Sequence, residues 1–548
     1  MTTADLILTN GRIYTVDRAQ PWVEAVAIAK GRITALGSDA EVRAAAPQAQ
    51  IIDLDGRMAM PGIVDVHNHV LMGGTSDLFE LRFAGDASVE EICALVRAAA
   101  QKAPAGQWIM GAQWGADAIA ALNTLEALAQ LDEAALGHPV CLRDETAHNR
   151  WVNSEAMRLA GITEATPDPE MGSFGRDPAT GKLTGMMIES AAGIVERVAA
   201  EQFTEEMGRA AAAQAIRTLN SFGVTAFLEA ASMQSTLSAL HGLDQRGELS
   251  AWAVAAMPAM EPNFMFGISG DELFALREDY RSEHVRPDYV KIFLDGVPGA
   301  KTAAFHEAYV EDPIHGCCFR GATMVTYPEL IRWLGKCEAQ NLSVKIHCAG
   351  DAAVTQALDA VDVVRSFNGP TALIHHIAHA SYIAPSDIPR FAELGVAADL
   401  SPMIWFPTTF LEGHKEAMGT ERAERFWPNA DLLKAGALIA GGSDWPVIAN
   451  PDPWTGIEGL VTRQNPSGAF PGVSLWSEQA LDLPTAVEVF TINSAKAIGL
   501  DKEIGSLAVG KSADIIVLSQ NIFDIPADAI ADTKVLKTYF EGREVFPR

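Results

Sequence analysis

The middle of the chain, residues 61–500, alternates short segments rich in β-branched residues with longer segments rich in Ala, Leu and Glu. Strand-like runs occur at 224–228, 289–294, 343–347, 372–379 and 438–442. Helix-like stretches such as 205–221, 327–340 and 351–366 lie between them. This alternation is typical of parallel β/α units, and a closed barrel is the best solution at this size. The sequence therefore predicts an α/β protein built on a (β/α)8 barrel of the TIM type.

One interval does not fit a simple barrel. From His69 to Lys291 is 291 − 69 = 222 residues, more than two or three β/α units need. Residues 78–205 contain two helix-like stretches, 88–101 and 124–135, and a passage rich in Gly, Asp and Pro. Because loops that follow barrel strands build the active-site face, we expect 78–205 to form an inserted lid or substrate subdomain there.

Both ends of the chain are rich in short strand-like runs separated by turns. Asn10-Gly11 and Lys30-Gly31 each separate two such runs, and Asn-Gly is a strong hairpin-turn dipeptide. Neither end has enough strands for a full sandwich. We therefore expect residues 1–60 and 501–548 to form one small β-sandwich domain, which leaves 61–77 and 206–500 for the catalytic barrel.

Composition excludes several classes of protein. A formal charge of −29 over 548 residues argues against nucleic acid or an anionic membrane as a partner. The six cysteines include no Cys-x-x-Cys pair, which indicates reduced thiols in a cytoplasmic protein. No secretory signal and no apolar run of about 18 residues is visible. A Rossmann-type cofactor enzyme is disfavoured because no Gly-x-Gly-x-x-Gly follows a strand.

A metal site is indicated where residues 63–66 end in His67-Asn68-His69. In a strand, side chains two residues apart point to the same side, so both imidazoles can reach one ion. The alternative is that two polar residues simply mark the point where a strand leaves the core.

Four further polar residues lie at the ends of candidate strands: Lys291, His347, His379 and Asp444. Each has an ordinary explanation alone, as an edge lysine, a helix cap or a turn cap. Those explanations do not account for all of them lying where barrel strands should end. Their shared position favours one common site.

These residues lie in a set of motifs that extends over most of the chain. The motifs are Pro61-Gly-Ile-Val-Asp-Val-His-Asn-His69, Val290-Lys-Ile-Phe-Leu-Asp-Gly296, His347-Cys-Ala-Gly-Asp-Ala352, Ile377-Ala-His-Ala380, Gly442-Ser-Asp-Trp-Pro-Val447, Thr491-Ile-Asn-Ser-Ala-Lys-Ala497 and Gly505-Ser-Leu-Ala-Val-Gly-Lys-Ser-Ala-Asp514. With them, the sequence resembles the amidohydrolase superfamily of metal-dependent hydrolases. Within it, the sequence is similar to the branch of the N-substituted formamide deformylases and the YtcJ-like proteins.

The resemblance implies a role for each ligand. His67 and His69 would bind the more buried metal, and His347 and His379 a second one. Lys291 would be N-carboxylated and bridge the two ions. Asp444 would bind metal, hold the attacking water and take its proton. Neutral imidazoles and carboxylates suit Zn²⁺, in one or two ions, although other divalent metals fit as well.

The sequence departs from the family pattern at two places. Ile377-Ala378 replaces the acidic residue often found two positions before the last histidine ligand, and His375 and His376 offer alternative registers for that ligand. The family's Asp-Gly-Ser-Leu-Gly-like loop reads here as 295–301, which leaves the substrate open.

Weaker candidates complete the predicted site. His148, in a polar part of the insertion, would polarise the scissile carbonyl or bind the leaving group, or else is a solvated residue. Trp114, Trp405, Phe406 and Trp445 would line an apolar substrate pocket, or else belong to the core.

The predicted function is metal-dependent hydrolysis of a non-peptide C–N bond in a small, partly apolar amide, N-substituted formamide or carbamate. One alternative is ester, lactone or N-acyl amino acid hydrolysis at the same site. Another is a non-catalytic, metal-binding regulatory protein. The predicted partner is a small-molecule substrate. A homodimer is compatible with the sequence, which does not determine the oligomeric state.

Overall fold

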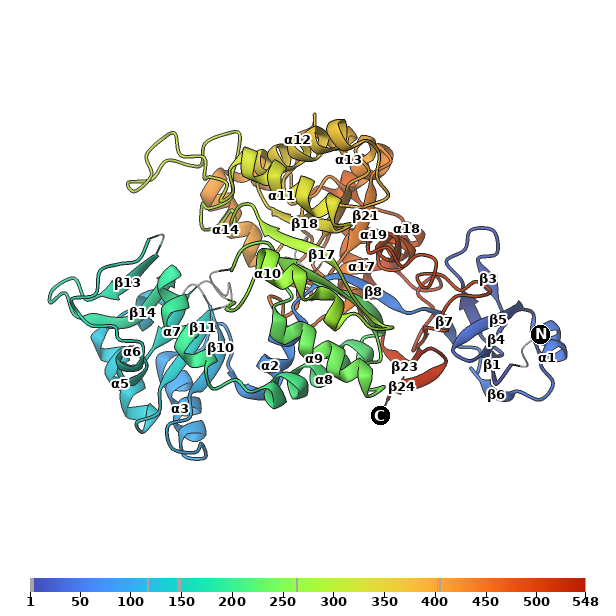
Figure 1. Ribbon diagram of the computed structural model, residues 1–548, viewed down its shortest axis with the longest axis horizontal. Coiled ribbons are helices and arrows are strands. Elements are labelled where there is room, and N and C mark those ends of the chain that lie inside the picture. The colour runs from blue at the N-terminus through green and yellow to red at the C-terminus, as the bar shows by residue number, and fades with distance from the viewer. Residues whose placement is uncertain are drawn as a thin grey trace.

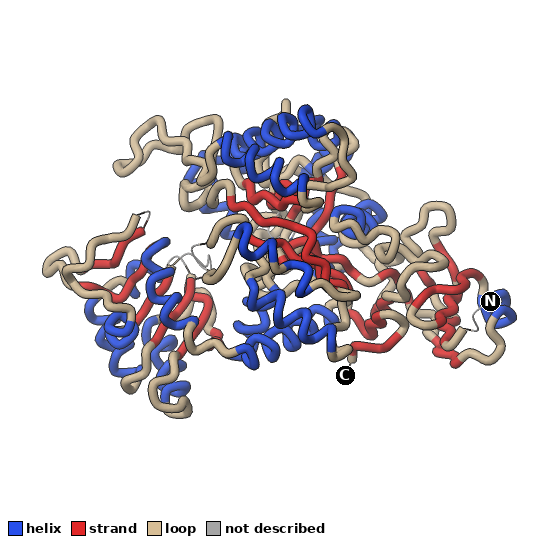
Figure 2. The backbone as a smooth tube through the Cα atoms, in the orientation of Figure 1, coloured by secondary structure: helices blue, strands red, loops and turns tan. Residues whose placement is uncertain are grey.

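The computed structural model describes residues 4–115, 118–144, 149–170, 172–262, 265–401, 403 and 406–547. Figure 1 shows three parts side by side: the insertion at one end, the barrel in the middle and a small β part at the other end. Figure 2 shows strands inside the middle part with helices around them, as expected for a β/α barrel.

The central sheet is a nearly closed barrel of parallel strands in the order β21-β20-β19-β18-β17-β16-β15-β8. These strands are β8 (Ile63–Asn68), β15 (Val224–Glu229), β16 (Trp252–Pro258), β17 (Val285–Phe293), β18 (Ser343–Cys348), β19 (His376–His379), β20 (Ala397–Leu400) and β21 (Leu438–Gly441). The predicted barrel is confirmed.

The two edge strands of this sheet, β8 and β21, meet beside the first histidine. The backbone N–H of Asp444 donates to the carbonyl of His67 at 2.6 Å. A Cβ on Gly442 would lie 2.5 Å from the Cβ of His67. Only glycine lets the chain after β21 approach β8 this closely, and that approach brings Asp444 to the histidines.

Helices cover the outside of the barrel and bury one apolar face each. Helix α8, for example, begins at Thr204, whose side chain accepts from Met207 N–H, and it buries Ala211, Ala215 and Leu219. The helices of this part are α2 (Val70–Phe79), α8 (Glu205–Ser221), α9 (Gln234–Gln245), α10 (Gly270–Ala275), α11 (Tyr327–Ala339), α12 (Asp351–Asn368), α13 (Ile388–Glu393), α14 (Thr409–Met418), α15 (Thr420–Ala423), α16 (Asn429–Lys434), α17 (Pro453–Thr462), α18 (Leu483–Val489) and α19 (Ile492–Ala497).

The two ends of the chain meet in a pair of small sheets. One has the order β5-β4-β1-β6 and the other β24-β23-β22-β7-β2-β3. Their elements are β1 (Leu6–Thr9), β2 (Arg12–Tyr14), β3 (Trp22–Val23), β4 (Ala25–Ala29), β5 (Arg32–Gly37), α1 (Asp39–Ala45), β6 (Gln50–Asp53), β7 (Met58–Pro61), β22 (Ile515–Leu518), β23 (Val535–Phe540) and β24 (Arg543–Phe546). Leu8 and Ile28 of the first sheet share a core with Ile515 and Tyr539 of the second.

The two predicted turns in this part differ. Lys30 and Gly31 both have positive φ and join β4 and β5 as an antiparallel hairpin. Asn10-Gly11 is not a hairpin turn, because β1 pairs with β4 and β6 whereas β2 pairs with β3 and β7. Asn10 instead carries the chain from one sheet to the other.

The insertion after the first barrel strand has a sheet of its own, in the order β13-β14-β12-β11-β10-β9. Its elements are β9 (Glu80–Arg82), α3 (Val89–Ala100), β10 (Ile109–Trp114), α4 (Ile119–Leu122), α5 (Leu125–Ala135), β11 (Val140–Asp144), β12 (Arg150–Val152), α6 (Ser154–Leu159), β13 (Gly172–Arg176), β14 (Leu183–Glu189) and α7 (Ser190–Ala200). Gln113 donates to the carbonyl of Pro446 at 3.0 Å, two residues after Asp444. The insertion therefore touches the barrel rim beside the predicted site. The domain boundaries given in the sequence analysis remain a prediction.

Among the described residues, no helix is both long and apolar enough to cross a membrane. The cytoplasmic location stays a prediction.

Candidate metal centre

The six predicted ligands lie at the carboxyl ends of five barrel strands. They are His67 and His69 at the end of β8, Lys291 in β17, His347 in β18, His379 at the end of β19, and Asp444 just after β21. Four of them are buried, and the side chains of His347 and His379 are 12% and 13% exposed. In a parallel barrel these ends form the face on which active sites are built.

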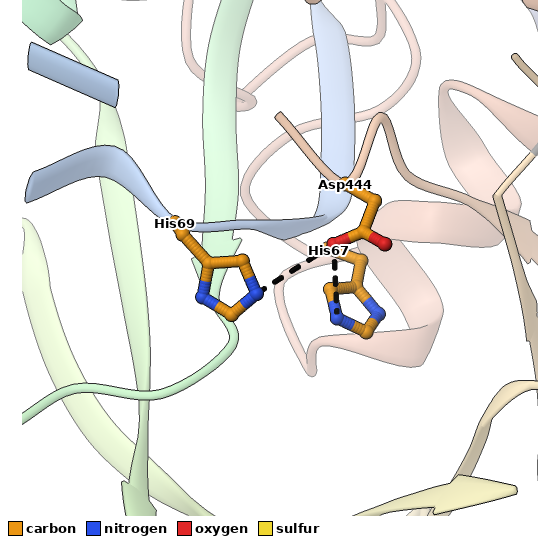
Figure 3. A group of neighbouring side chains, drawn as sticks. All are labelled: His67, His69 and Asp444. Carbon is orange, nitrogen blue, oxygen red and sulfur yellow. Dashed lines mark ion pairs between the residues drawn. The ribbon is translucent and has the colours of Figure 1, made fainter. Parts of the chain in front are cut away.

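The tightest group is His67, His69 and Asp444 (Figure 3). Oδ1 of Asp444 lies 3.8 Å from Nε2 of His67 and 3.6 Å from Nε2 of His69. Figure 3 shows the carboxylate between the two rings, with both Nε2 atoms turned toward it. Asp444 holds this place with φ at 58°, a left-handed conformation that is uncommon and costly outside glycine.

The other three side chains adjoin this group. Nζ of Lys291 lies 3.5 Å from Nε2 of His67, and Nδ1 of His379 lies 3.9 Å from Oδ2 of Asp444. The ring centroid of His379 is 4.6 Å from that of His67 and 4.6 Å from that of His347. The structure thus brings all six predicted residues together.

The ambiguity among the three histidines near β19 is resolved by their contacts. Nδ1 of His375 accepts from Val344 N–H, and Nε2 of His376 lies 2.9 Å from the carbonyl of Ala497. The other nitrogen of His376 faces Asp399 at 3.4 Å, beneath the site, so neither ring is turned toward the other ligands. His379 is the one that faces the other ligands.

A polar side chain lies beside Nδ1 of each histidine, and none of these four side chains was predicted to have this role. Nδ1 of His347 lies 3.1 Å from Asp295, and Nδ1 of His379 lies 3.3 Å from the hydroxyl of Ser401. Nδ1 of His67 is 3.6 Å from Asp399, and that of His69 is 3.7 Å from Glu229. A hydrogen bond at this nitrogen fixes the tautomer and orientation of a metal-binding imidazole, as for His347 and His379, whereas Nδ1 of His67 and of His69 only faces a carboxylate beyond hydrogen-bond distance. Spacing could not reveal them, because each comes from a different strand or loop.

A buried ion pair lies beneath the site. The ammonium group of Lys345 donates to the carboxylate of Asp399 and, at 2.9 Å, to the carbonyl of Val66. Lys345 and Asp399 are both fully buried. Lys345 is the register partner of Lys291 on the neighbouring strand, so two lysines lie side by side inside the barrel.

The electrostatic state of the site suits metal binding. Burial lowers the pKa of His67 and of His379 well below the usual value, and neighbouring cationic groups lower both further. Burial and then Lys345 lower the pKa of Lys291 to about 7. Burial raises the pKa of Asp444. The imidazoles of His67 and His379 are therefore neutral, which is the form that can donate a lone pair to a cation.

The residues fit a divalent cation. Ligand atoms of His67, His69 and Asp444 all lie within 4.8 Å of one another. Their 3.6 and 3.8 Å separations are too long for hydrogen bonds. Two ligands with bonds of about 2.1 Å to one tetrahedral ion would lie roughly 3.4 Å apart. Two imidazole nitrogens and a carboxylate are the donor set that zinc-type ions prefer.

Two of the four aromatic candidates, Trp114 and Trp445, do not line a pocket at this site. Trp114 is fully buried in the core of the insertion, where its Nε1 donates to the carbonyl of Leu142. Trp445 is buried in the barrel core, with its ring against Gly73. Both are core residues, because a side chain without exposed surface offers a substrate nothing to contact. His148 and Trp405 lie outside the described residues.

Replacing Asp295 with Asn should lower turnover or metal affinity by about 10- to 100-fold, the usual effect of losing such a partner. Asp295 Oδ1 accepts from Ala349 N–H as well as facing His347, so an amide would disturb the ring that it orients. Metal content and kcat would be measured on the same preparation. Asp387→Asn, a change at an equally buried aspartate that pairs with Arg390, is the control. If the two variants lose activity equally, Asp295 has no special role.

Comparisons with known proteins agree with this geometry. A sequence profile of the amidohydrolase family matches residues 50–546. The chain belongs to the amidohydrolase family. It is 29% identical to Protein LONG AFTER FAR-RED 3 of Arabidopsis thaliana, over 99% of this chain and 92% of that protein. It is 27% identical to the N-substituted formamide deformylase of Arthrobacter pascens, over 98% of this chain and 97% of that enzyme.

Comparison with a solved structure supports the same fold. The crystal structure of a metal-dependent hydrolase from Pyrococcus horikoshii superimposes with a TM-score of 0.76 at 25% identity, covering 95% of this chain and 99% of that one. The resemblance seen in the sequence is therefore confirmed for the family and for the fold. Family and neighbour together support a hydrolase, and the bond that this amidohydrolase cleaves is a separate question.

Proposed function

We propose that this amidohydrolase cleaves a non-peptide C–N bond in a small, partly apolar amide, N-substituted formamide or carbamate, with Zn²⁺ as its metal. The observation that carries the proposal is the convergence of His67, His69 and Asp444, with Lys291 and two further histidines beside them. The formamide deformylase of Arthrobacter pascens, similar over nearly the whole chain, supports the choice of bond.

His67, His69 and Asp444 would hold one cation, and His347 and His379 would hold a second. Lys291 could serve as a ligand only as a neutral amine or as a carbamate, because an ammonium group has no lone pair to donate. Its burial among these groups disfavours the ammonium form. We propose that its N-carboxylated form bridges the two positions.

A bound divalent cation would lower the pKa of a coordinated water from about 15.7 to near 7 and polarise the substrate carbonyl. Asp444 orients the attacking water and accepts its proton at a carboxylate oxygen. Burial raises the pKa of Asp444, which makes this carboxylate a better proton acceptor. When the C–N bond breaks, Asp444 returns the proton to the departing nitrogen, and the carbonyl carbon keeps the oxygen of the water.

Removing metal should abolish hydrolysis, and adding Zn²⁺ should restore it. The purified protein would be treated with a chelator, dialysed, and assayed before and after Zn²⁺ is returned, with metal content measured at each step. Activity that is indifferent to the chelator would refute the metal-dependent mechanism.

The bond can be identified with three substrates: an N-substituted formamide, an N-acyl amino acid and an aryl ester. The proposal expects the formamide to be cleaved with the highest kcat/KM. A preference for the ester or the N-acyl amino acid would replace the proposed substrate class while leaving the site assignment intact. Metal-dependent turnover of none of them would favour the regulatory alternative.

A further inference from the structure

A second cluster of metal-binding side chains lies at the opposite end of strand β17 from Lys291. His284 immediately precedes this strand, and its ring packs between Trp252 and Phe540, with centroid distances of 4.9 and 5.2 Å. Phe540 ends β23, so the cluster lies where the barrel floor meets the carboxyl-terminal hairpin. None of the residues of the catalytic group takes part.

The orientation of the His284 ring is fixed by Asp244, in helix α9. Oδ1 of Asp244 lies 2.7 Å from Nδ1 of His284, and Oδ2 accepts from the hydroxyl of Ser282 at 2.5 Å and from His284 N–H at 3.1 Å. The carboxylate therefore accepts a hydrogen bond from the ring N–H at Nδ1. In the neutral imidazole this leaves the lone pair on Nε2.

Nε2 of His284 is buried and has no hydrogen-bond partner among the described residues. His284 is only 8% exposed. This nitrogen points at the carboxylate of Glu541, in the turn between β23 and β24, with Oε2 at 3.5 Å. Glu283 completes the group, with ligand atoms of all three residues within 4.8 Å of one another.

Because Nε2 of His284 is buried, a lone pair there that faces a carboxylate oxygen needs a positive charge between the two atoms. A shared proton would draw Nε2 and Oε2 to about 2.8 Å, shorter than the observed distance. Two ligands of one tetrahedral cation, with bonds of about 2.1 Å, would lie roughly 3.4 Å apart. The carboxylate behind the other ring nitrogen is the usual support of a metal-binding histidine.

We propose that Glu283, His284 and Glu541 bind a divalent cation of the zinc type, with Asp244 orienting the histidine. One imidazole nitrogen and two carboxylates match the preference of such ions. The cation would join the entrance of β17 to the hairpin of β23 and β24. Its role is structural, and it does not depend on the proposed catalytic function.

The competing occupant is a proton. Although burial lowers it, the hydrogen bond that the ring donates to the carboxylate of Asp244, together with the nearby carboxylate of Glu541, raises the pKa of His284 to about 9. An imidazolium held between these two carboxylates would need neither a metal nor Glu283. The metal and the imidazolium therefore predict different effects of removing the carboxylate of Glu283.

The test compares bound zinc in the full-length wild-type protein and two variants, each loaded with Zn²⁺ and dialysed under the same conditions. His284→Gln should bind one zinc ion fewer per chain than the wild type. Glu283→Gln should bind zinc at this site at least about tenfold more weakly. In both variants, added Zn²⁺ should raise the Tm less than it does in the wild type, because the contribution of this site is lost. Glu503→Gln, which removes a carboxylate paired with Arg32 in the same region, is the control and should match the wild type.

Glu283 is exposed, and its side chain has no hydrogen-bond partner among the described residues, so Glu283→Gln should fold even if His284→Gln does not. Equal zinc content and an equal zinc-dependent Tm in Glu283→Gln and the wild type would overturn the proposal and leave the imidazolium. Loss of hydrolysis without a change in this zinc count would bear only on the catalytic site.

Discussion

Asp444→Asn should reduce kcat by at least about 10²- to 10⁴-fold while the protein stays folded, the range expected when a group that moves a proton is lost. Oδ1 of Asp444 lies 3.6 to 3.8 Å from Nε2 of His69 and His67, so an amide there removes a negative charge from between two imidazoles. The amide also cannot take a proton from water. The backbone contact from Asp444 N–H to His67 remains in the variant, so the barrel edge should hold.

The measurement is kcat on samples of known metal content, with the far-ultraviolet circular dichroism and the Tm recorded alongside. Asp359→Asn, at a half-buried aspartate that pairs with Arg390 on the outside of the barrel, makes the same chemical change away from the site. It should leave kcat within about twofold, as surface substitutions usually do. Full activity in Asp444→Asn would refute the site assignment. If Asp444→Asn had no turnover but kept the cellular role of the protein, this would support the alternative of a non-catalytic regulatory protein.

The sequence was sufficient to predict the strands that carry ligands. Strand β8 is β-branched and ends in His67 and His69, so its pattern and its chemistry agree. The barrel strands β16 and β20 were not predicted. Strand β16 is rich in alanine, and β20 has four residues with an aspartate among them. Neither has the β-branched composition by which a strand is recognised in a sequence. Both form strands because they pair with the neighbouring strands of the barrel.

In the insertion, too, only some of the elements could be predicted from the sequence. Two of its three longer helices, α3 and α5, were expected at 88–101 and 124–135 and are found at Val89–Ala100 and Leu125–Ala135, whereas α7 was not predicted. Both begin at Ser or Thr caps, which a sequence displays directly. The sheet beside them was not predicted. Its strands β9 and β12 have three residues each, too few for a periodic pattern.

The candidate site could also be predicted only in part. Its direct ligands could be predicted because each lies in a short motif. The groups behind them, such as Asp399 and Glu229, lie in barrel strands where nothing nearby in the sequence marks them. Lys345 looked like part of an ordinary strand. Its significance comes from Asp399, 54 residues away, which it meets only because β18 and β20 face the same interior.

Lys345→Met should cost about 3–5 kcal/mol of the free energy of unfolding, the usual result of removing one partner of a buried ion pair. Methionine matches the length of lysine, so little volume is lost. The variant leaves the carboxylate of Asp399 without its ammonium partner and the carbonyl of Val66 without its donor, both inside the barrel. Denaturant unfolding at constant pH, with the midpoint and the slope fitted together, measures the loss.

Two comparisons make this result specific to the buried pair. Lys537→Met breaks a surface pair with Glu544, whose side chains are 40% and 36% exposed, and should cost no more than about 1 kcal/mol. Lys345→Met combined with Asp399→Leu removes both charges and should recover most of the lost stability, because a buried pair can often be replaced by apolar residues at little cost. The same double variant should still lose turnover, because Asp399 faces Nδ1 of His67. Recovered stability without recovered activity would mean that the pair is kept for the site above it. A loss below about 1 kcal/mol in Lys345→Met alone would instead show that the barrel interior tolerates a lone carboxylate at this position.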